Sequence, residues 1–285
     1  LVRQAKEQNA DLVLFPELCL SGSTCGSLLN TSLLEKQSVD ALDKVLVSTG
    51  TLDITIVVGM LLRVGPSFQS VAAVCRKGSV IGICCPAVPQ CKVSLLGRDV
   101  TVGNNLLFKI GNAGFTVVCG PQANPENKYI LQGNYRENGA QILLCMASAP
   151  EYAGGFGALC NALKYVSKAN SMACVYAGAG CGESDTDALY AGHAVIAENG
   201  VVLGEDCSAD LENSLLQIND IDIELLDNRF AAGSGNKPLA ATMTVLDTGA
   251  VPSDNTGNLL RMVDAAPFTT LFGDAVDEHL QSAVH

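Results

Sequence analysis

The chain has 285 residues, of which 48% are hydrophobic, and its formal net charge at pH 7 is −12. So acidic a protein repels a phosphate backbone, which argues against nucleic acid as a partner. No apolar run reaches the roughly 18 to 20 residues needed to cross a bilayer, and no basic segment precedes an apolar one at the start, so neither a membrane nor secretion is expected. Length and apolar content fit one α/β domain, which we place by default in the cytoplasm.

Apolar runs of strand length alternate with helical stretches along the chain. Several of the runs are continuously apolar, which is typical of strands buried on both faces. This alternation predicts a layered α/β fold. The expected helices cover residues 1–9, 33–46, 128–138 and 157–171, and the expected strands cover residues 12–15, 54–62, 70–76, 80–84, 115–119, 141–146, 173–177 and 193–198.

Residues 11–26, DLVLFPELCLSGSTCG, run from an apolar strand into a single carboxylate. Pro16 cannot continue a central ladder, so the chain turns there and presents Glu17 at the strand end. The apolar neighbours Leu14 and Phe15 disfavour the charged form of Glu17 and raise its pKa, which suits a general base near neutral pH. A surface glutamate after a core strand is the simpler interpretation, because one acid without a partner defines no reaction.

This stretch, FPEL followed by SGSTCGSLL, resembles the glutaminase domain of glutamine-dependent NAD synthetases, a branch of the nitrilase-like carbon–nitrogen hydrolases. Residues 173–200, ACVYAGAGCGESDTDALYAGHAVIAENG, are similar to that domain's GES-T-D loop, GH strand and AENG turn. The segments GFTVVCG, GAQILLCMAS and DIDIELLDNRF keep the expected spacing. The resemblance implies one domain, a four-layer αββα nitrilase-like sandwich, over residues 1–262, with a tail or the start of a linker at 263–285.

The same resemblance implies a catalytic triad of a glutamate base, a lysine that supports the oxyanion and a cysteine nucleophile at a strand end. Glu17 fits the base. The lysine position follows the strand GSVIG and holds Cys85 or Pro86, depending on a shift of one residue. The nearest cation, Lys92, reaches that position only if the loop slides, and a solvated surface lysine is the simpler interpretation.

The nucleophile position depends on how the strand FTVVCGPQ is aligned. Without a gap it falls on Gln122, which cannot form an acyl-enzyme. A deletion within the strand would instead make Cys119 the nucleophile, although a buried strand cysteine is the simpler interpretation of that residue.

The resemblance places substrate-binding residues at Ser148, Glu151 and Glu183. Most hydroxyl groups expected around Ser148 are missing, and the following GGFGAL segment offers no Arg or Lys for a glutamine carboxylate. Of three histidines only His193 lies in the core, where it is expected to be structural. The 12 cysteines form no pattern with metal-ligand spacing, so we expect no metal and no cofactor.

Motifs of the fold persist in this sequence while the reactive residues are lost. We therefore predict a catalytically degenerate glutaminase-type domain that acts as a structural or regulatory partner. It would work in a homo-oligomer or beside a synthetase domain or subunit. The alternative is an active amidohydrolase that releases ammonia from glutamine through Glu17 and Cys119. The resemblance also implies that the first strand of the fold would precede residue 1 and that a phosphate loop for NAD synthesis lies outside this sequence.

Overall fold

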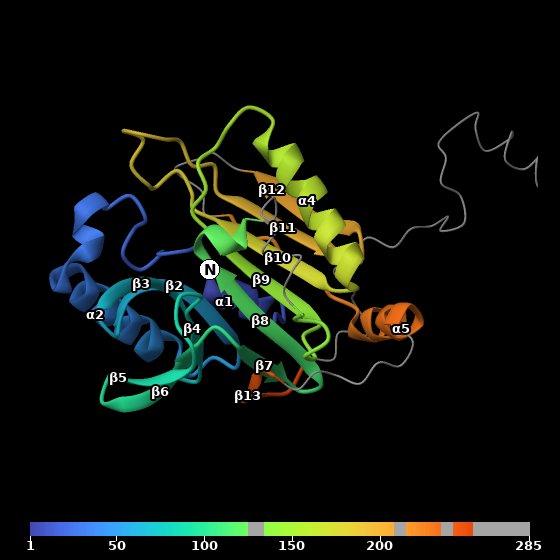
Figure 1. The fold of residues 1–285 in the computed structure, drawn as a ribbon, viewed down its shortest axis with the longest axis horizontal. Helices are drawn as coiled ribbons and strands as arrows, with labels where there is room; N and C mark the ends of the chain where they lie inside the picture. The colour runs from blue at the N-terminus through green and yellow to red at the C-terminus, as the bar shows by residue number, and fades with distance from the viewer. Residues whose placement is uncertain (125–133, 208–214, 235–241, 253–285) are drawn as a thin grey trace, which may run out of the picture.

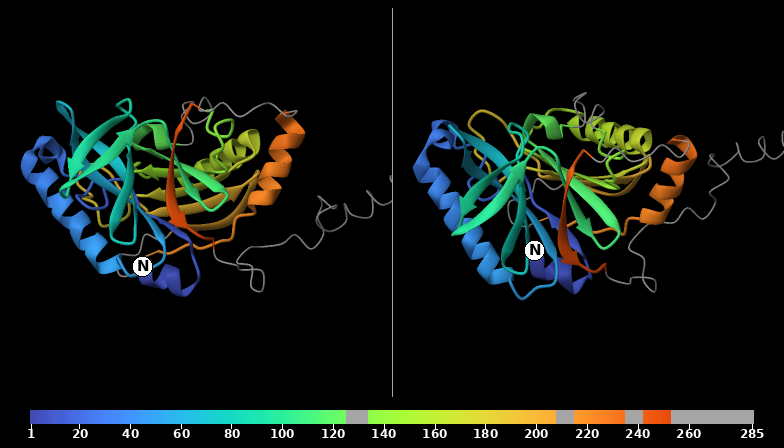
Figure 2. Two further views of the ribbon diagram at one scale, coloured as in Figure 1. Left: turned by 90° about the horizontal axis from the view of Figure 1, so that it is seen from below. Right: turned by 60° about the horizontal axis from the view of Figure 1, so that its bottom comes forward.

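The computed structural model describes residues 1–124, 134–207, 215–234 and 242–252. Two sheets pack face to face, and helices cover the outer face of each (Figure 1). Helices α1 (Val2–Glu7) and α2 (Ser32–Thr49) lie on the first sheet, and α4 (Gly155–Asn170) lies on the second (Figure 2). The four-layer αββα sandwich predicted from the sequence is confirmed.

The first sheet has six strands in the order β1-β2-β3-β4-β6-β5. Its edge strand β1 runs parallel to β2, with Leu12 opposite Thr55. The turns between β2, β3 and β4 are tight, so these three strands form an antiparallel meander. The strands are β1 (Leu12–Leu14), β2 (Thr55–Val64), β3 (Ser67–Arg76), β4 (Ser79–Cys84), β5 (Cys91–Leu95) and β6 (Arg98–Gly103).

The second sheet has seven strands in the order β12-β11-β10-β9-β8-β7-β13. Its centre is parallel, since β9 pairs in parallel with both β8 and β10. The parallel centre places the carboxyl ends of β8, β9 and β10 at one edge. The strands are β7 (Leu106–Ile110), β8 (Ala113–Cys119), β9 (Ile142–Ala147), β10 (Ala173–Gly178), β11 (His193–Glu198), β12 (Val201–Cys207) and β13 (Thr244–Ala250).

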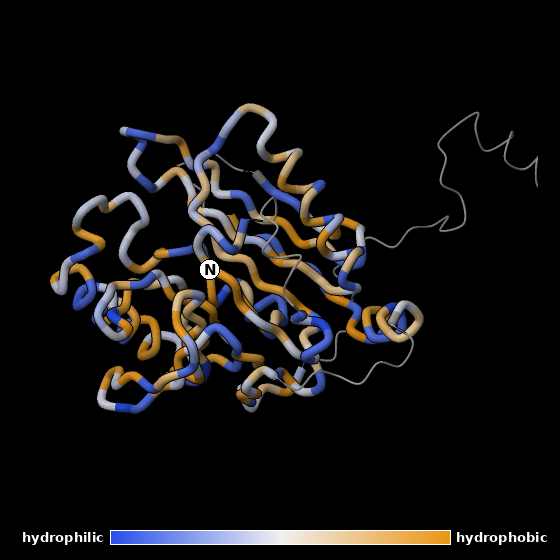
Figure 3. Tube along the Cα trace, viewed as in Figure 1, coloured by the Kyte–Doolittle hydropathy of each residue, from blue (hydrophilic) through white to orange (hydrophobic). Residues whose placement is uncertain are grey.

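Successive side chains of the buried strands point to opposite faces of the sheet and pack into different hydrophobic cores. On β2, Val58 packs beneath α2, whereas Val57 packs between the two sheets. On β9, Leu143 packs beneath α4, whereas Leu144 faces the first sheet. These apolar strands form the orange centre of Figure 3. Three cores, one between each pair of layers, therefore explain the continuous apolar runs of the sequence.

Every strand predicted from the sequence is present, and three predicted helices correspond to α1, α2 and α4. Of the predicted helix 128–138, residues 128–133 lie outside the described residues. The remainder forms a turn, in which the Asn138 N–H donates to the Asn134 carbonyl at 3.1 Å. The sequence prediction missed strands β5, β6, β7, β12 and β13 and helix α5 (Ile223–Ser234). The predicted tail 263–285 lies outside the described residues.

None of the helices within the described ranges combines the length and apolar character that a membrane-spanning segment requires.

Candidate functional site

The loop after β1 is shaped by a close approach to the neighbouring strand. A Cβ at Gly59 of β2 would lie 2.8 Å from the Glu17 carbonyl carbon and still closer to Leu18 N and Pro16 O. The glycine carbonyl then accepts the Leu20 N–H at 3.1 Å. Only a residue without a side chain permits this contact, so Gly59 fixes how the loop presents Glu17.

The Glu17 side chain is 9% exposed and reaches the edge where β8 and β9 end. Its Oε2 accepts the Ser148 N–H at 3.0 Å, and the Gly120 N–H also hydrogen-bonds to it. Burial raises the pKa of Glu17 above its ordinary value, and the Ser70 hydroxyl and these two N–H groups oppose that rise without cancelling it. The carboxyl group therefore has the raised pKa expected from the sequence.

Cys119, one candidate nucleophile, ends β8 with its side chain in the core between the sheets. The thiol is 2% exposed, and Sγ lies 3.6 Å from the Ser70 carbonyl oxygen. Burial raises its pKa well above the ordinary value, and the nearby charge of Glu17 raises it further. A thiol in this environment stays protonated at neutral pH, which makes it a poor nucleophile.

The predicted lysine position lies at the end of β4. Cys85 is fully buried there, its N–H donates to the Gly103 carbonyl at 2.9 Å, and burial raises the pKa of its thiol. Pro86 follows it, half-buried. Lys92 is exposed on β5. Glu17 and Cys85 both add to the rise in the Cys119 pKa, so these three residues lie near one another. Neither Cys85 nor Pro86, the two candidates for the lysine position, carries a positive charge.

The other candidate nucleophile position, Gln122, lies half-buried in a short 3₁₀ helix, η2 (Gly120–Ala123). The turn into η2 begins at Gly120, whose φ of 70° lies in the left-handed region. A Cβ built at Gly120 would lie 3.4 Å from Glu17 Oε1. The sequence analysis missed this residue, although a glycine directly after a buried strand was a signal that the chain turns there.

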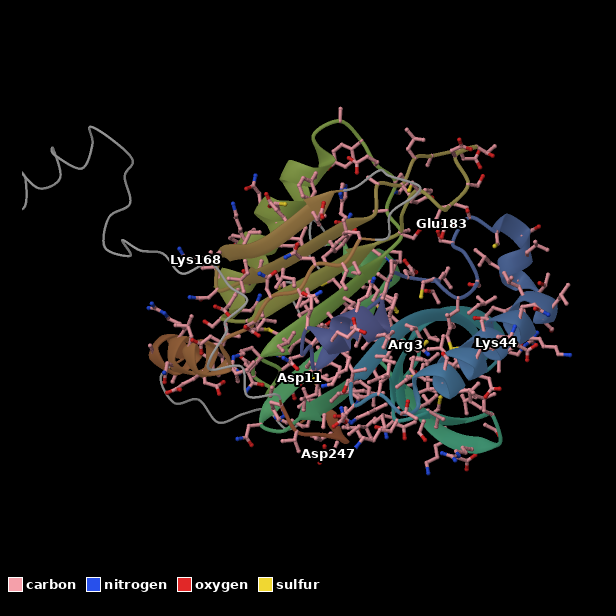
Figure 4. The ribbon with its side chains drawn as sticks, turned by 180° about the vertical axis from the view of Figure 1, so that it is seen from behind. Arg3, Asp11, Lys44, Lys168, Glu183 and Asp247 are labelled. Atoms are coloured by element: carbon pink, nitrogen blue, oxygen red, sulfur yellow. The ribbon has the colours of Figure 1, made fainter. Side chains whose placement is uncertain are left out.

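Glu183 connects the loop that follows β10 to the loop that follows β1 (Figure 4). Its carboxylate accepts the Ser23 N–H at 2.9 Å, the Thr24 N–H at 3.0 Å and the Thr24 hydroxyl at 2.6 Å. Burial acts to raise the pKa of Glu183, but these donors outweigh it and the pKa is lowered. The Ser148 hydroxyl donates to Ser23 Oγ at 2.6 Å, so both Ser148 and Glu183 hold loops in place.

Glu151, the third predicted substrate-binding residue, is engaged by the protein. Its carboxylate hydrogen-bonds to His193 Nε2, and its N–H donates to the Leu189 carbonyl at 2.7 Å. The His193 ring lies on Phe156 of α4 with centroids 4.8 Å apart. His193 thus has the structural surroundings expected for it. Among the described residues, no group of three His, Cys, Asp or Glu side chains is arranged to hold a metal ion.

The layered fold defines the structural class of this protein: it has the fold of the nitrilase superfamily. A structure of an amidase of that superfamily from Nesterenkonia matches with a TM-score of 0.58 and 20% identity, covering 82% of this chain and 87% of that one. A glutamine-dependent NAD(+) synthetase from Cytophaga hutchinsonii matches with a TM-score of 0.62 and 17% identity, covering 72% of this chain and 36% of that one.

Sequence comparison finds similarity to one kind of enzyme, glutamine-dependent NAD(+) synthetase. Glutamine-dependent NAD(+) synthetase from Mycobacterium tuberculosis (strain H37Rv) is 28% identical over 94% of this chain and 43% of its own length. The same enzyme from Mycobacterium leprae (strain TN) is 25% identical over the same shares. No family model matches. The resemblance found in the motifs is therefore confirmed, and the chain spans less than half the length of these curated relatives.

Proposed function

We propose that this chain is a glutaminase-type domain that no longer hydrolyses glutamine and serves as a structural or regulatory partner. The observation that carries the proposal is the state of Cys119, whose thiol is 2% exposed and has a pKa raised well above its ordinary value. Attack on an amide carbon requires a thiolate in contact with the substrate. A protonated thiol between two sheets meets neither requirement.

The oxyanion side of the reaction is equally unsupported. Acyl transfer gains much of its rate from positive groups or N–H donors aimed at the developing negative charge. The position that should carry an ammonium holds the buried thiol of Cys85, and Lys92 is exposed on β5. Of the candidate residues that the structure describes, the site therefore keeps a carboxyl group with a raised pKa, while Cys119 is not activated and Cys85 is not a cation.

The partner is part of this proposal. The match to the M. tuberculosis enzyme covers 94% of this chain but only 43% of that protein. Because less than half of that enzyme is matched, we propose that this domain works beside a synthetase domain or subunit. We also propose that the domain forms a homo-oligomer in the cytoplasm. Size-exclusion chromatography with light scattering on the purified chain measures the second point, and a monomer at all concentrations would contradict it.

The proposed loss of hydrolysis is tested by measuring the release of ammonia from glutamine and asparagine. We expect the purified chain to release no more ammonia than a buffer blank, with or without the change Cys119→Ala. Release above the blank that disappears in Cys119→Ala would refute the proposal.

The raised pKa of Glu17 favours a second candidate, an amidohydrolase that uses Glu17 and Cys119 with a cation such as Lys92. In a Glu-to-Gln mutant of a similar amidase from Nesterenkonia, the acetamide moiety of fluoroacetamide is added covalently at the active-site cysteine. An active site of this kind predicts that iodoacetamide modifies Cys119 faster than the exposed Cys91 at neutral pH. Slower modification of Cys119, read by peptide mass spectrometry, would exclude this candidate.

A further inference from the structure

Gly120 occupies a position that no sequence motif identified. It is the first residue after β8, and its φ of 70° turns the chain out of the sheet into η2. Its N–H hydrogen-bonds to the carboxylate of Glu17. A Cβ on this residue would lie 3.4 Å from Glu17 Oε1, which is ordinary van der Waals contact. A side chain at this position therefore starts beside the carboxylate.

Cys119, the neighbouring candidate, does not share this placement. The side chains of β8 alternate, so that Val118 joins the core beneath α4 and Cys119 joins the core between the sheets. Cys119 Sγ faces the Ser70 carbonyl oxygen there. Gln122 lies further along η2. A Cβ at Gly120 leads to Glu17 Oε1, whereas the Cys119 side chain leads into the core between the sheets.

We propose that Gly120 is the nucleophile position of this site, and that its lack of a side chain is what leaves Glu17 without a nucleophile. The inference rests on the proposed function and adds to it the residue at which reactivity was lost. It predicts that a thiol introduced by Gly120→Cys is activated by Glu17, unlike the buried thiol of Cys119.

Acrylamide is a suitable probe, because its addition needs only a thiol and a base. The introduced thiol gives its proton to Glu17 Oε1 while sulfur forms a bond to the terminal alkene carbon of acrylamide. The alkene electron pair moves toward the carbonyl, and the carbon next to the carbonyl then takes the proton back from Glu17. The product is a thioether with one acrylamide added and the carboxylate restored, so no oxidant or other reactant is needed.

The experiment measures acrylamide addition at pH 7 by peptide mass spectrometry, with the exposed Cys91 as the internal reference. In Gly120→Cys we expect the introduced thiol to react at least about tenfold faster than Cys91, and the added change Glu17→Gln to remove that advantage. Gly120→Ala carries the same backbone strain without a thiol and should gain no modification over the natural chain. A rate equal to that of Cys91, or one unchanged by Glu17→Gln, would overturn the proposal.

A second measurement covers a Gly120→Cys variant that fails to fold. Carboxyl carbon NMR of glutamate-labelled protein follows the titration of Glu17. We expect Gly120→Ala to move this titration and Gln122→Ala to leave it in place, and the opposite result assigns the position to Gln122. Unfolding of both Gly120 variants also overturns the proposal, because a nucleophile position must admit a Cβ. The ammonia assay on the natural chain is independent: activity there refutes the proposed function, whereas an inert introduced thiol refutes only this inference.

Discussion

Glu17 and Glu183 belong to one connected set of loops but are held in opposite ways. Ser148 links them, because its N–H donates to Glu17 and its hydroxyl donates to Ser23, whose own N–H donates to Glu183. Burial dominates at Glu17 and raises its pKa, whereas donors dominate at Glu183 and lower its pKa. Of the two glutamates, the candidate base Glu17 is therefore the one at which hydrogen bonds do not compensate for burial.

The largest effect should come from disturbing the loop that presents Glu17. Gly59→Ala would drive a Cβ into the backbone at Pro16, Glu17 and Leu18, so we expect a loss of about 3 kcal/mol in the free energy of unfolding. Urea unfolding followed by circular dichroism measures it. The matched control is Gly157→Ala in α4, where a Cβ meets nothing within 4 Å and a helix should gain about 0.5–1 kcal/mol. Equal stability of the two variants would contradict this account of the loop.

The next effect concerns Glu183. Glu183→Ala removes the acceptor for three donors of residues 23 and 24, and we expect a loss of about 1–2 kcal/mol, since the carboxylate is half-exposed and screened by water. A lowered pKa stabilises the folded state above the unfolded pKa of about 4.3. The difference between wild type and variant should thus be constant from pH 6 to 8 and shrink as the pH falls below about 4. A difference that grows in acid would refute this role.

Glu17 should respond to pH in the opposite sense. Its raised pKa means that the folded state favours the protonated carboxyl group, so this stabilisation is present below about pH 4.3 and is lost as the pH rises through the folded-state pKa. Glu17→Gln lacks this titration. The melting temperature of the variant should therefore gain on that of wild type as the pH rises from 4 to 8. Parallel melting curves would mean that burial does not control this carboxyl group.

The smallest effect should be at Lys92. This side chain is exposed on β5, and surface substitutions usually stay within about 0.5 kcal/mol. We expect Lys92→Ala to leave both stability and the Glu17 titration unchanged, measured as above. A shift in the Glu17 titration would show that Lys92 reaches the site and would revive the amidohydrolase candidate.

The sequence predicted those parts of the fold whose signal is local. The apolar runs of β2, β3, β8 and β9 are buried on both faces and need no partner to be recognised. The missed hairpin β5–β6 carries exposed residues such as Lys92 and Arg98, so it lacks an apolar run. Strand β13 was missed because it is defined by pairing in parallel with β7, far away in the sequence.

The same distinction holds for the site. The position of Glu17 at a strand end could be predicted because the strand, Pro16 and the carboxyl group are adjacent in sequence. The simpler interpretation, a surface glutamate, is wrong, since Glu17 is 9% exposed. The nucleophile position facing it could not be predicted, because the alignment leaves open whether residues are deleted within the strand that ends at Cys119. We infer that position from the direction of a Cβ built on Gly120, which the spacing of residues along the sequence does not reveal.

The pairing of β13 with β7 has a consequence for how this protein folds. The register joins Thr244 to Leu106, so the second sheet is completed by contacts between segments that are far apart in sequence. Such contacts carry a high loop-closure cost and slow folding. We therefore expect one edge of β7 to stay unpaired during synthesis until β13 has been made. Unpaired strand edges can pair with other chains, and in the folded protein β13 covers this edge of β7.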